Sequence, residues 1–171
     1  MKKRKITALM SAVLMAFLMI SGIGGCKGKS EKKPSGAAAA IPFKLTTFDN
    51  QEFSLEAMKG KTVVVNFFAS WCGPCRFEAK TLEKAYQAYK NDGVEFIAVA
   101  VDDTEAGAKG FIKEFNITFP AGRDAAGEIM KAYNIYGVPQ TNIIGKDGAV
   151  SYTHSGAISE DILFREIKRA L

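Results

Sequence analysis

The stretch that most constrains this chain is the pentapeptide WCGPC at residues 71–75. An apolar run from Thr62 to Phe68 precedes it and a stretch with helical periodicity follows, which predicts that a buried strand turns into a helix here. Cys72 would then lie at a helix N-terminus, where free backbone N–H groups and the helix dipole favour a thiolate over a thiol. Cys75 follows one helical turn later. The two sulfurs are therefore suited to cycle between a dithiol and a disulfide.

A zinc half-site and a purely structural disulfide are the competing interpretations of this cysteine pair. A structural zinc ion takes about four ligands, whereas the chain has one further cysteine, Cys26, and one histidine, His154. A structural bridge across so short a loop would constrain the unfolded chain little. We therefore favour a redox disulfide between Cys72 and Cys75, and we expect neither a metal nor another cofactor.

The WCGPC motif after a valine-rich strand resembles the thioredoxin superfamily, and YGVPQ at residues 136–140 resembles that family's cis-proline loop. The match spans about residues 41–171. Within the superfamily the chain looks most like the membrane-tethered TlpA/ResA-like thiol-disulfide oxidoreductases, several of which serve cytochrome c maturation. That narrower resemblance rests on the N-terminal leader, on Glu78 and on the segment inserted between residues 102 and 135.

Strand-like and helix-like stretches alternate along residues 41–171, which predicts an α/β fold. Residues 61–68 and 94–101 read as central strands, and a hairpin is predicted at residues 141–153 around the turn GKDG. Helices are predicted between the central strands, after Thr104, around residues 129–136 and after Ser159. Residues 43–55 predict an added N-terminal hairpin at a sheet edge. The result is a thioredoxin-like three-layer fold, with a mixed central sheet and helices on both faces.

Residues 1–25 have the pattern of an export leader, with a basic start and an uncharged run from Ile6 to Ile23. The sequence IGGC at residues 23–26 resembles a lipobox, so we predict lipidation of Cys26 and a flexible tether over residues 26–40. An uncleaved signal anchor is the alternative, because the apolar run is nearly long enough to span a bilayer. Both interpretations place the domain at the extracytoplasmic face of a bacterial membrane, periplasmic or cell-surface.

The positive net charge of +5 belongs to the leader and the tether. Residues 1–40 hold eight of the 23 basic residues and one of the 18 acidic residues. The domain itself therefore carries a small excess of acidic residues, which argues against nucleic-acid binding.

Glu78 is a candidate for proton handling. It follows Cys75 by three residues and so returns to nearly the same helix face. The resemblance to the TlpA/ResA-like group implies a role for a glutamate here, and its pKa should rise near a partly buried thiolate. The alternative is an ordinary solvated helix glutamate. Asn66 stands where ordinary thioredoxins carry a buried aspartate, and because Asn cannot exchange a proton, the acid–base role would pass to Glu78, to water or to nothing.

Pro139, if cis as the resemblance implies, would place the backbone of Val138 opposite Cys72, where an extended substrate segment could pair with it. A trans, structural proline is the alternative. Trp71 is expected to shape the docking surface. Arg76 would either add positive potential near the thiolate or be solvated, and His154 is expected on the exposed surface.

These residues predict a thiol-disulfide oxidoreductase in which the Cys72 thiolate attacks a substrate disulfide and Cys75 resolves the mixed disulfide. Written in this direction the enzyme reduces protein disulfides and takes its electrons from a membrane donor, and the resemblance points to apocytochrome c as a substrate. Two alternatives belong to other classes. A peroxiredoxin-like peroxide reductase uses one peroxidatic cysteine in a different motif, and a copper-delivery lipoprotein uses more widely spaced cysteines with a distant histidine.

Overall fold

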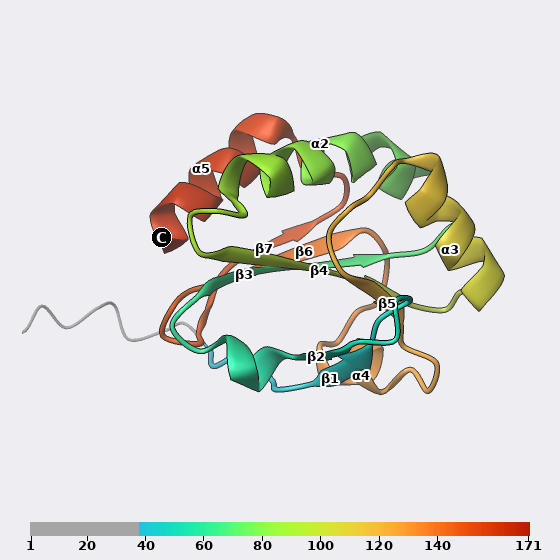
Figure 1. Cartoon of the computed structure of the whole chain (residues 1–171), viewed down its shortest axis with the longest axis horizontal. Coiled ribbons are helices and arrows are strands. Elements are labelled where there is room, and N and C mark those ends of the chain that lie inside the picture. The colour runs from blue at the N-terminus through green and yellow to red at the C-terminus, as the bar shows by residue number, and fades with distance from the viewer. Residues whose placement is uncertain (1–37) are drawn as a thin grey trace, which may run out of the picture. The chain divides into compact units, whose positions relative to one another are not determined.

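The computed structural model describes residues 38–171. The predicted leader and Cys26 therefore lie outside the described residues, as does most of the tether. No helix in the described range is long and apolar enough to cross a membrane. The elements, shown in Figure 1, are β1 (Lys44–Thr46), β2 (Glu52–Ser54), the 3-10 helix η1 (Leu55–Met58), β3 (Thr62–Phe68), α2 (Gly73–Tyr89), β4 (Val94–Ala100), α3 (Glu105–Glu114), β5 (Ala121–Arg123), α4 (Glu128–Ala132), β6 (Gln140–Ile144), β7 (Val150–Ser155) and α5 (Glu160–Ala170).

The central sheet has five strands in the order β5-β4-β3-β6-β7. β3 runs parallel to β4, and β4 runs parallel to β5, whereas β6 is antiparallel to both β3 and β7. The predicted mixed sheet is confirmed. All seven residues of β3 are buried, and this explains why its sequence is a continuous apolar run instead of an alternating one.

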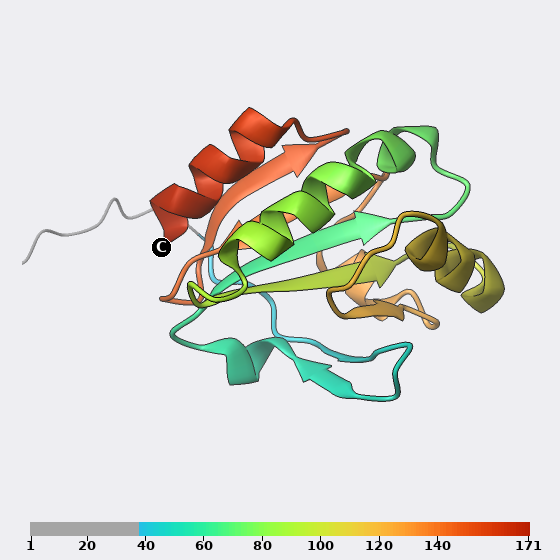
Figure 2. The same ribbon diagram turned by 45° about the horizontal axis from the view of Figure 1, so that its top comes forward.

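Each face of the sheet carries its own layer (Figures 1 and 2). Helices α2, α3 and α5 cover one face, and the β1–β2 hairpin, η1 and α4 cover the other. The prediction of helices on both faces is confirmed, although α4 is short and shares its face with the hairpin. The first layer packs around Phe68, Leu82, Phe96, Phe111 and Leu163, and the second around Leu45, Phe53, Val65, Ile97 and Ile129.

The predicted N-terminal hairpin forms, with Asn50 in the left-handed region at its turn. It lies across a face of the sheet, because Leu45 and Phe53 point into the core. It reaches the edge strand β5 through a single bridge between Thr47 and Gly122. A Cβ atom at Gly122 would lie 2.5 Å from the Thr46 carbonyl oxygen, so this approach requires glycine.

The predicted helix starts are partly confirmed. Thr104 caps α3, because its Oγ1 accepts a hydrogen bond from the Gly107 N–H at 3.0 Å. Ser159 occupies the corresponding position before α5, but its side chain makes no capping bond. The helix predicted up to residue 136 ends at Ala132, and Asn134 then takes a positive φ of 51°.

Candidate active site

Cys72 and Cys75 form a disulfide at the junction between β3 and α2. Cys72 is the N-cap of α2, and its sulfur accepts a hydrogen bond from the Cys75 backbone N–H at 3.1 Å. The exposed fraction is 3% for Cys72 and 1% for Cys75. The site therefore holds the redox pair as predicted, at a helix N-terminus whose N–H groups would also stabilise a Cys72 thiolate after reduction.

The loop before Cys72 is fastened to the loop after β4. The Asp103 carboxylate accepts hydrogen bonds from the Ser70 backbone N–H at 2.6 Å and from the Ser70 hydroxyl at 2.9 Å. The Trp71 indole N–H donates to the Asp102 carbonyl oxygen at 2.9 Å, and the Trp71 side chain remains exposed. Sequence reasoning missed Asp103. The available signal was its place just after β4, because the carboxyl ends of parallel neighbours meet at one edge of a sheet.

The Val138–Pro139 peptide bond is cis, so the alternative of a trans proline is wrong. The Val138 carbonyl oxygen lies 3.5 Å from the Cys72 sulfur. Val138 is half-buried and Pro139 is buried. The structure thus brings the Val138 backbone opposite Cys72, which is the arrangement in which an extended segment could pair with it. Its role in substrate binding stays a prediction.

Glu78 is buried, with an exposed fraction of 2%, so the alternative of a solvated helix glutamate is wrong. Its carboxylate accepts hydrogen bonds from Asn66 Nδ2 and from the Ile158 backbone N–H, both at 2.8 Å. Burial raises the pKa of Glu78 from 4.5 to about 7, and the bonds from Ile158 and Asn66 offset part of that rise. In this disulfide-bonded state the cause is desolvation of the carboxyl group. A group with this pKa is suited to exchange protons at neutral pH.

Asn66 links three elements at the centre of the site. Its side-chain amide donates to Glu78 on α2 at 2.8 Å and to the Thr141 hydroxyl on β6 at 3.0 Å. Asn66 therefore holds the buried Glu78 carboxyl group and connects β3 to α2 and β6.

The loop after β7 joins Glu78 to the cis-proline segment. The Gly156 backbone N–H donates to the Pro139 carbonyl oxygen at 2.8 Å, two residues before the Ile158 N–H donates to Glu78. One short loop therefore holds both the buried acid and the segment that faces Cys72. The sequence could not predict this link, because every residue except proline has a backbone N–H that could donate such a bond.

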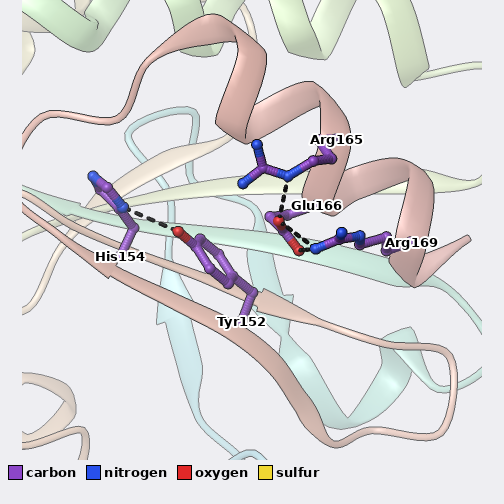
Figure 3. Close-up of polar contacts among 5 residues, drawn as sticks. All are labelled: Tyr152, His154, Arg165, Glu166 and Arg169. Atoms are coloured by element: carbon purple, nitrogen blue, oxygen red, sulfur yellow. Dashed lines mark hydrogen bonds and ion pairs between the residues drawn. The ribbon is translucent and has the colours of Figure 1, made fainter.

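His154 lies on β7 beside this loop and is half-buried, so its predicted exposure is wrong. The alternation of the strand places Tyr152 on the same side, and the Tyr152 hydroxyl lies 3.2 Å from His154 Nδ1 (Figure 3). His154 Nε2 lies 3.4 Å from the Ala157 carbonyl oxygen. The same view shows the buried Glu166 carboxylate of α5 bonded to Arg165 and Arg169.

Arg76 has partners on α3. Its guanidinium forms an ion pair with Glu114 and lies 5.0 Å from the centre of the Phe115 ring. The Glu114 carboxylate compensates its charge, and its side chain is 42% exposed, which agrees with the solvated alternative. Within residues 38–171, no three side chains of the types His, Cys, Asp and Glu gather as a metal-binding group.

A sequence profile of the Redoxin family matches residues 34–171. The chain belongs to the Redoxin family. The thiol-disulfide oxidoreductase ResA of Bacillus cereus is 32% identical over 174 residues, which cover 99% of this chain and 98% of that protein. A thiol:disulfide interchange protein of the thioredoxin family from Chlorobium tepidum has a solved structure with a TM-score of 0.74 and 30% identity, covering 81% of this chain and 99% of its own.

A third similar protein is a secreted disulfide oxidoreductase of Mycobacterium tuberculosis, described as homologous to DsbE of E. coli. Its structure has a TM-score of 0.68 and 27% identity, covering 74% of this chain and 95% of that one. These relatives and the Cys72–Cys75 disulfide confirm the predicted activity: this Redoxin is a thiol-disulfide oxidoreductase. Its substrates are accordingly disulfides and dithiols, which counts against the peroxide-reducing and copper-delivering alternatives.

Proposed function

We propose that this Redoxin reduces disulfide bonds of exported proteins outside the cytoplasm, with Cys72 as the attacking thiol and Cys75 as the resolving thiol. The observation that carries the proposal is the arrangement around Cys72: a helix N-terminus stabilises its sulfur, and the Val138 carbonyl lies 3.5 Å away on a cis-proline segment. That segment offers a substrate strand a partner beside the reactive sulfur.

The reaction consists of two exchanges. The Cys72 thiolate attacks one sulfur of the substrate disulfide, which forms a mixed disulfide and releases the other substrate sulfur as a thiolate that takes a proton. The Cys75 thiolate then attacks the Cys72 sulfur, which closes the enzyme disulfide and releases the second substrate thiol. Glu78 lies one helical turn from Cys75 and has a pKa of about 7. In our proposal it accepts the proton that Cys75 loses in the second exchange.

Two features favour reduction over oxidation. Gly73 and Pro74 are the residues that ordinary thioredoxins carry between their cysteines, and those proteins have potentials near −270 mV. Strong oxidants lie near −120 mV because their thiolate is unusually stabilised. A Glu78 carboxylate one turn away opposes such stabilisation of a thiolate, because like charges raise each other's pKa.

We therefore expect a reduction potential more negative than about −200 mV. Equilibration of the full chain, in a mild detergent, with glutathione buffers of graded ratio would measure it through the fraction of free Cys72 and Cys75. A value near −120 mV would make the protein an oxidant of dithiols and would contradict the proposal.

The location of the protein is part of the proposal. We place a lipoprotein-type leader at residues 1–25, a lipidated Cys26 with its tether at residues 26–40, and the catalytic domain at residues 41–171. The domain would then work at the extracytoplasmic face of a bacterial membrane and receive electrons from a membrane donor. The IGGC sequence at residues 23–26 supports this assignment, as does similarity to a secreted disulfide oxidoreductase.

We also infer a narrower substrate, the cysteines of apocytochrome c, from the resemblance to the ResA-like group. Cys75→Ala should trap substrates, because the mixed disulfide on Cys72 then lacks its resolving thiol. The matched control is the double variant Cys72→Ala/Cys75→Ala, which cannot form that bond. Recovery of apocytochromes c with the single variant alone supports the inference, whereas a broad set of secreted proteins contradicts it.

A further inference from the structure

Three aromatic side chains stand exposed around the redox site. Of the described residues, five large hydrophobic ones are exposed: Ile41, Trp71, Phe77, Tyr136 and Leu171. Trp71 already has a place beside Cys72. Phe77 and Tyr136 are the two most exposed of the five, with exposed fractions of 83% and 92%, and nothing in the reaction described above uses them.

Neither ring has a structural partner in the described part of the chain. The aromatic pairs of the core leave out both Phe77 and Tyr136, and the Tyr136 hydroxyl makes no hydrogen bond there. Aromatic rings gain more than most side chains when they leave water, and they are enriched where proteins bind one another. Two unpartnered rings beside a reaction centre therefore indicate a binding surface.

The positions of both rings are tied to the sulfurs. Phe77 lies one helical turn after Gly73, the residue that follows Cys72, on the exposed face of α2 that is turned away from the buried Cys75. Tyr136 precedes Val138 by two residues, which limits their Cα atoms to about 7 Å apart, and the Val138 carbonyl oxygen lies 3.5 Å from the Cys72 sulfur. An extended substrate advances about 3.3 Å per residue. Both rings are thus within reach of side chains a few residues from the substrate cysteine.

The burial of Cys72 decides what kind of partner fits. Cys72 is 3% exposed, whereas the two rings protrude into solvent. A rigid folded surface would meet the rings before its own sulfur reached Cys72. An extended segment can instead pair with the Val138 backbone, bring its cysteine to the recessed sulfur and lay its neighbouring side chains against the rings.

We propose that Phe77 and Tyr136 are apolar docking positions that select unfolded substrate segments whose cysteine is flanked by apolar or aromatic side chains. This inference rests on the proposed dithiol–disulfide function and adds the substrate class. In this arrangement Cys72 supplies the chemistry, Val138 supplies backbone pairing, and the two rings supply the preference for sequence context.

The test uses the reduced full chain in a mild detergent and two disulfide-bonded peptides of one length. The peptides differ in the residues that flank the cysteine, Leu and Phe in one and Ser and Gly in the other. Wild type should have the higher kcat/KM on the apolar peptide. Phe77→Ala and Tyr136→Ala should each lower that value about tenfold, mainly through KM, and change the value for the polar peptide less than about twofold.

Conservative and remote variants serve as controls. Phe77→Leu and Tyr136→Phe should restore most of the preference, because they keep an apolar side chain. Leu171→Ala is the remote control, because it removes an exposed apolar side chain far from Cys72. Leu171 is adjacent to Ala170, whose carbonyl oxygen accepts a hydrogen bond from Thr62 at the opposite end of β3 from Cys72. This variant should leave kcat/KM on both peptides unchanged. Unchanged reduction of glutathione disulfide would show that the chemistry is intact in every variant.

The outcomes separate the two proposals. If wild type reduces both peptides equally well, or the alanine variants slow both equally, the docking inference is wrong and the proposed function stands. If wild type reduces neither peptide, the proposed function fails and the inference fails with it. A dimer in wild type that dissociates in Phe77→Ala would show that a second copy of the chain covers the rings, which also overturns the inference.

Discussion

Replacing the buried acid, as in Glu78→Gln, should change how the free energy of unfolding depends on pH. The fold raises the pKa of Glu78 from 4.5 to about 7, so between these values the folded chain holds a proton that the unfolded chain releases. A raised carboxyl pKa contributes stability that is fully present below pH 4.5 and is lost as the pH rises through 7. The wild type therefore carries a destabilising buried charge at pH 8.

The structure sets the size of this effect. A pKa difference of about 2.5 units at about 1.4 kcal/mol per unit corresponds to roughly 3 kcal/mol. Glutamine at position 78 keeps the shape of the side chain and does not titrate. Its oxygen can accept from the Ile158 N–H. Its NH₂ group can donate to Asn66 once that amide turns over, and the Thr141 hydroxyl can then donate to the same Asn66 oxygen.

Urea unfolding of the oxidised chain between pH 4.5 and pH 8.5 would measure this effect, with wild type and Glu78→Gln compared at each pH. Subtracting the two curves cancels other titrating groups such as Glu105 and Glu166. We expect the variant to gain about 3 kcal/mol relative to wild type across this range, most of it between pH 5 and pH 7.5. A difference that stays constant with pH would show that Glu78 is ionised throughout, and the account of its burial would be wrong.

Three further predictions test other parts of the molecule. Glu78→Gln should alter the pH dependence of disulfide exchange near neutrality, measured by stopped-flow fluorescence of Trp71, and superimposable profiles would remove Glu78 from proton transfer. Cys26→Ala should abolish incorporation of labelled fatty acid and leave the leader uncleaved, whereas labelling that persists would rule out Cys26 as the lipidated residue. Thr104→Ala should lower the free energy of unfolding by about 1 kcal/mol, because the Gly107 N–H loses its cap, and Thr104→Ser should recover most of it.

The parts of the fold that the sequence predicts well are those set by local pattern. The run from Thr62 to Phe68 is apolar throughout because β3 is covered on both faces, and the cysteines, Gly73 and Pro74 mark the turn into α2. The GKDG turn between β6 and β7 is likewise local, because Gly148 supplies the positive φ that the hairpin needs. These signals are written in a few adjacent residues, so no distant contact is required to interpret them.

The parts that the sequence does not predict depend on distant backbone. The Ile158 N–H that holds Glu78 comes from a residue 80 positions away, and any non-proline residue there could donate the same bond. The burial of Glu78 could not be predicted for a related reason. The three-residue spacing shows that Glu78 and Cys75 lie on nearly the same face of the helix, but it does not show how much of that face other elements cover. The loop after β7 meets Glu78 through the Ile158 N–H only in the folded chain, and local spacing does not encode that contact.

The described chain also indicates which end of the domain a Cys26 anchor would hold. The Ala38 carbonyl accepts a hydrogen bond from the Val150 N–H. Val150 on β7 pairs with Ile144 on β6, and Ile144 pairs with Val63 near the start of β3. The chain therefore enters at the N-terminal end of β3, within the range we assign to the tether, whereas Cys72 follows the other end. β3 spans about 20 Å.

An anchor on Cys26 would thus leave the dithiol on the side of the domain that faces away from the attachment point. This arrangement suits substrates that arrive from the surrounding compartment, because an extended segment can reach the Val138 backbone without passing the membrane.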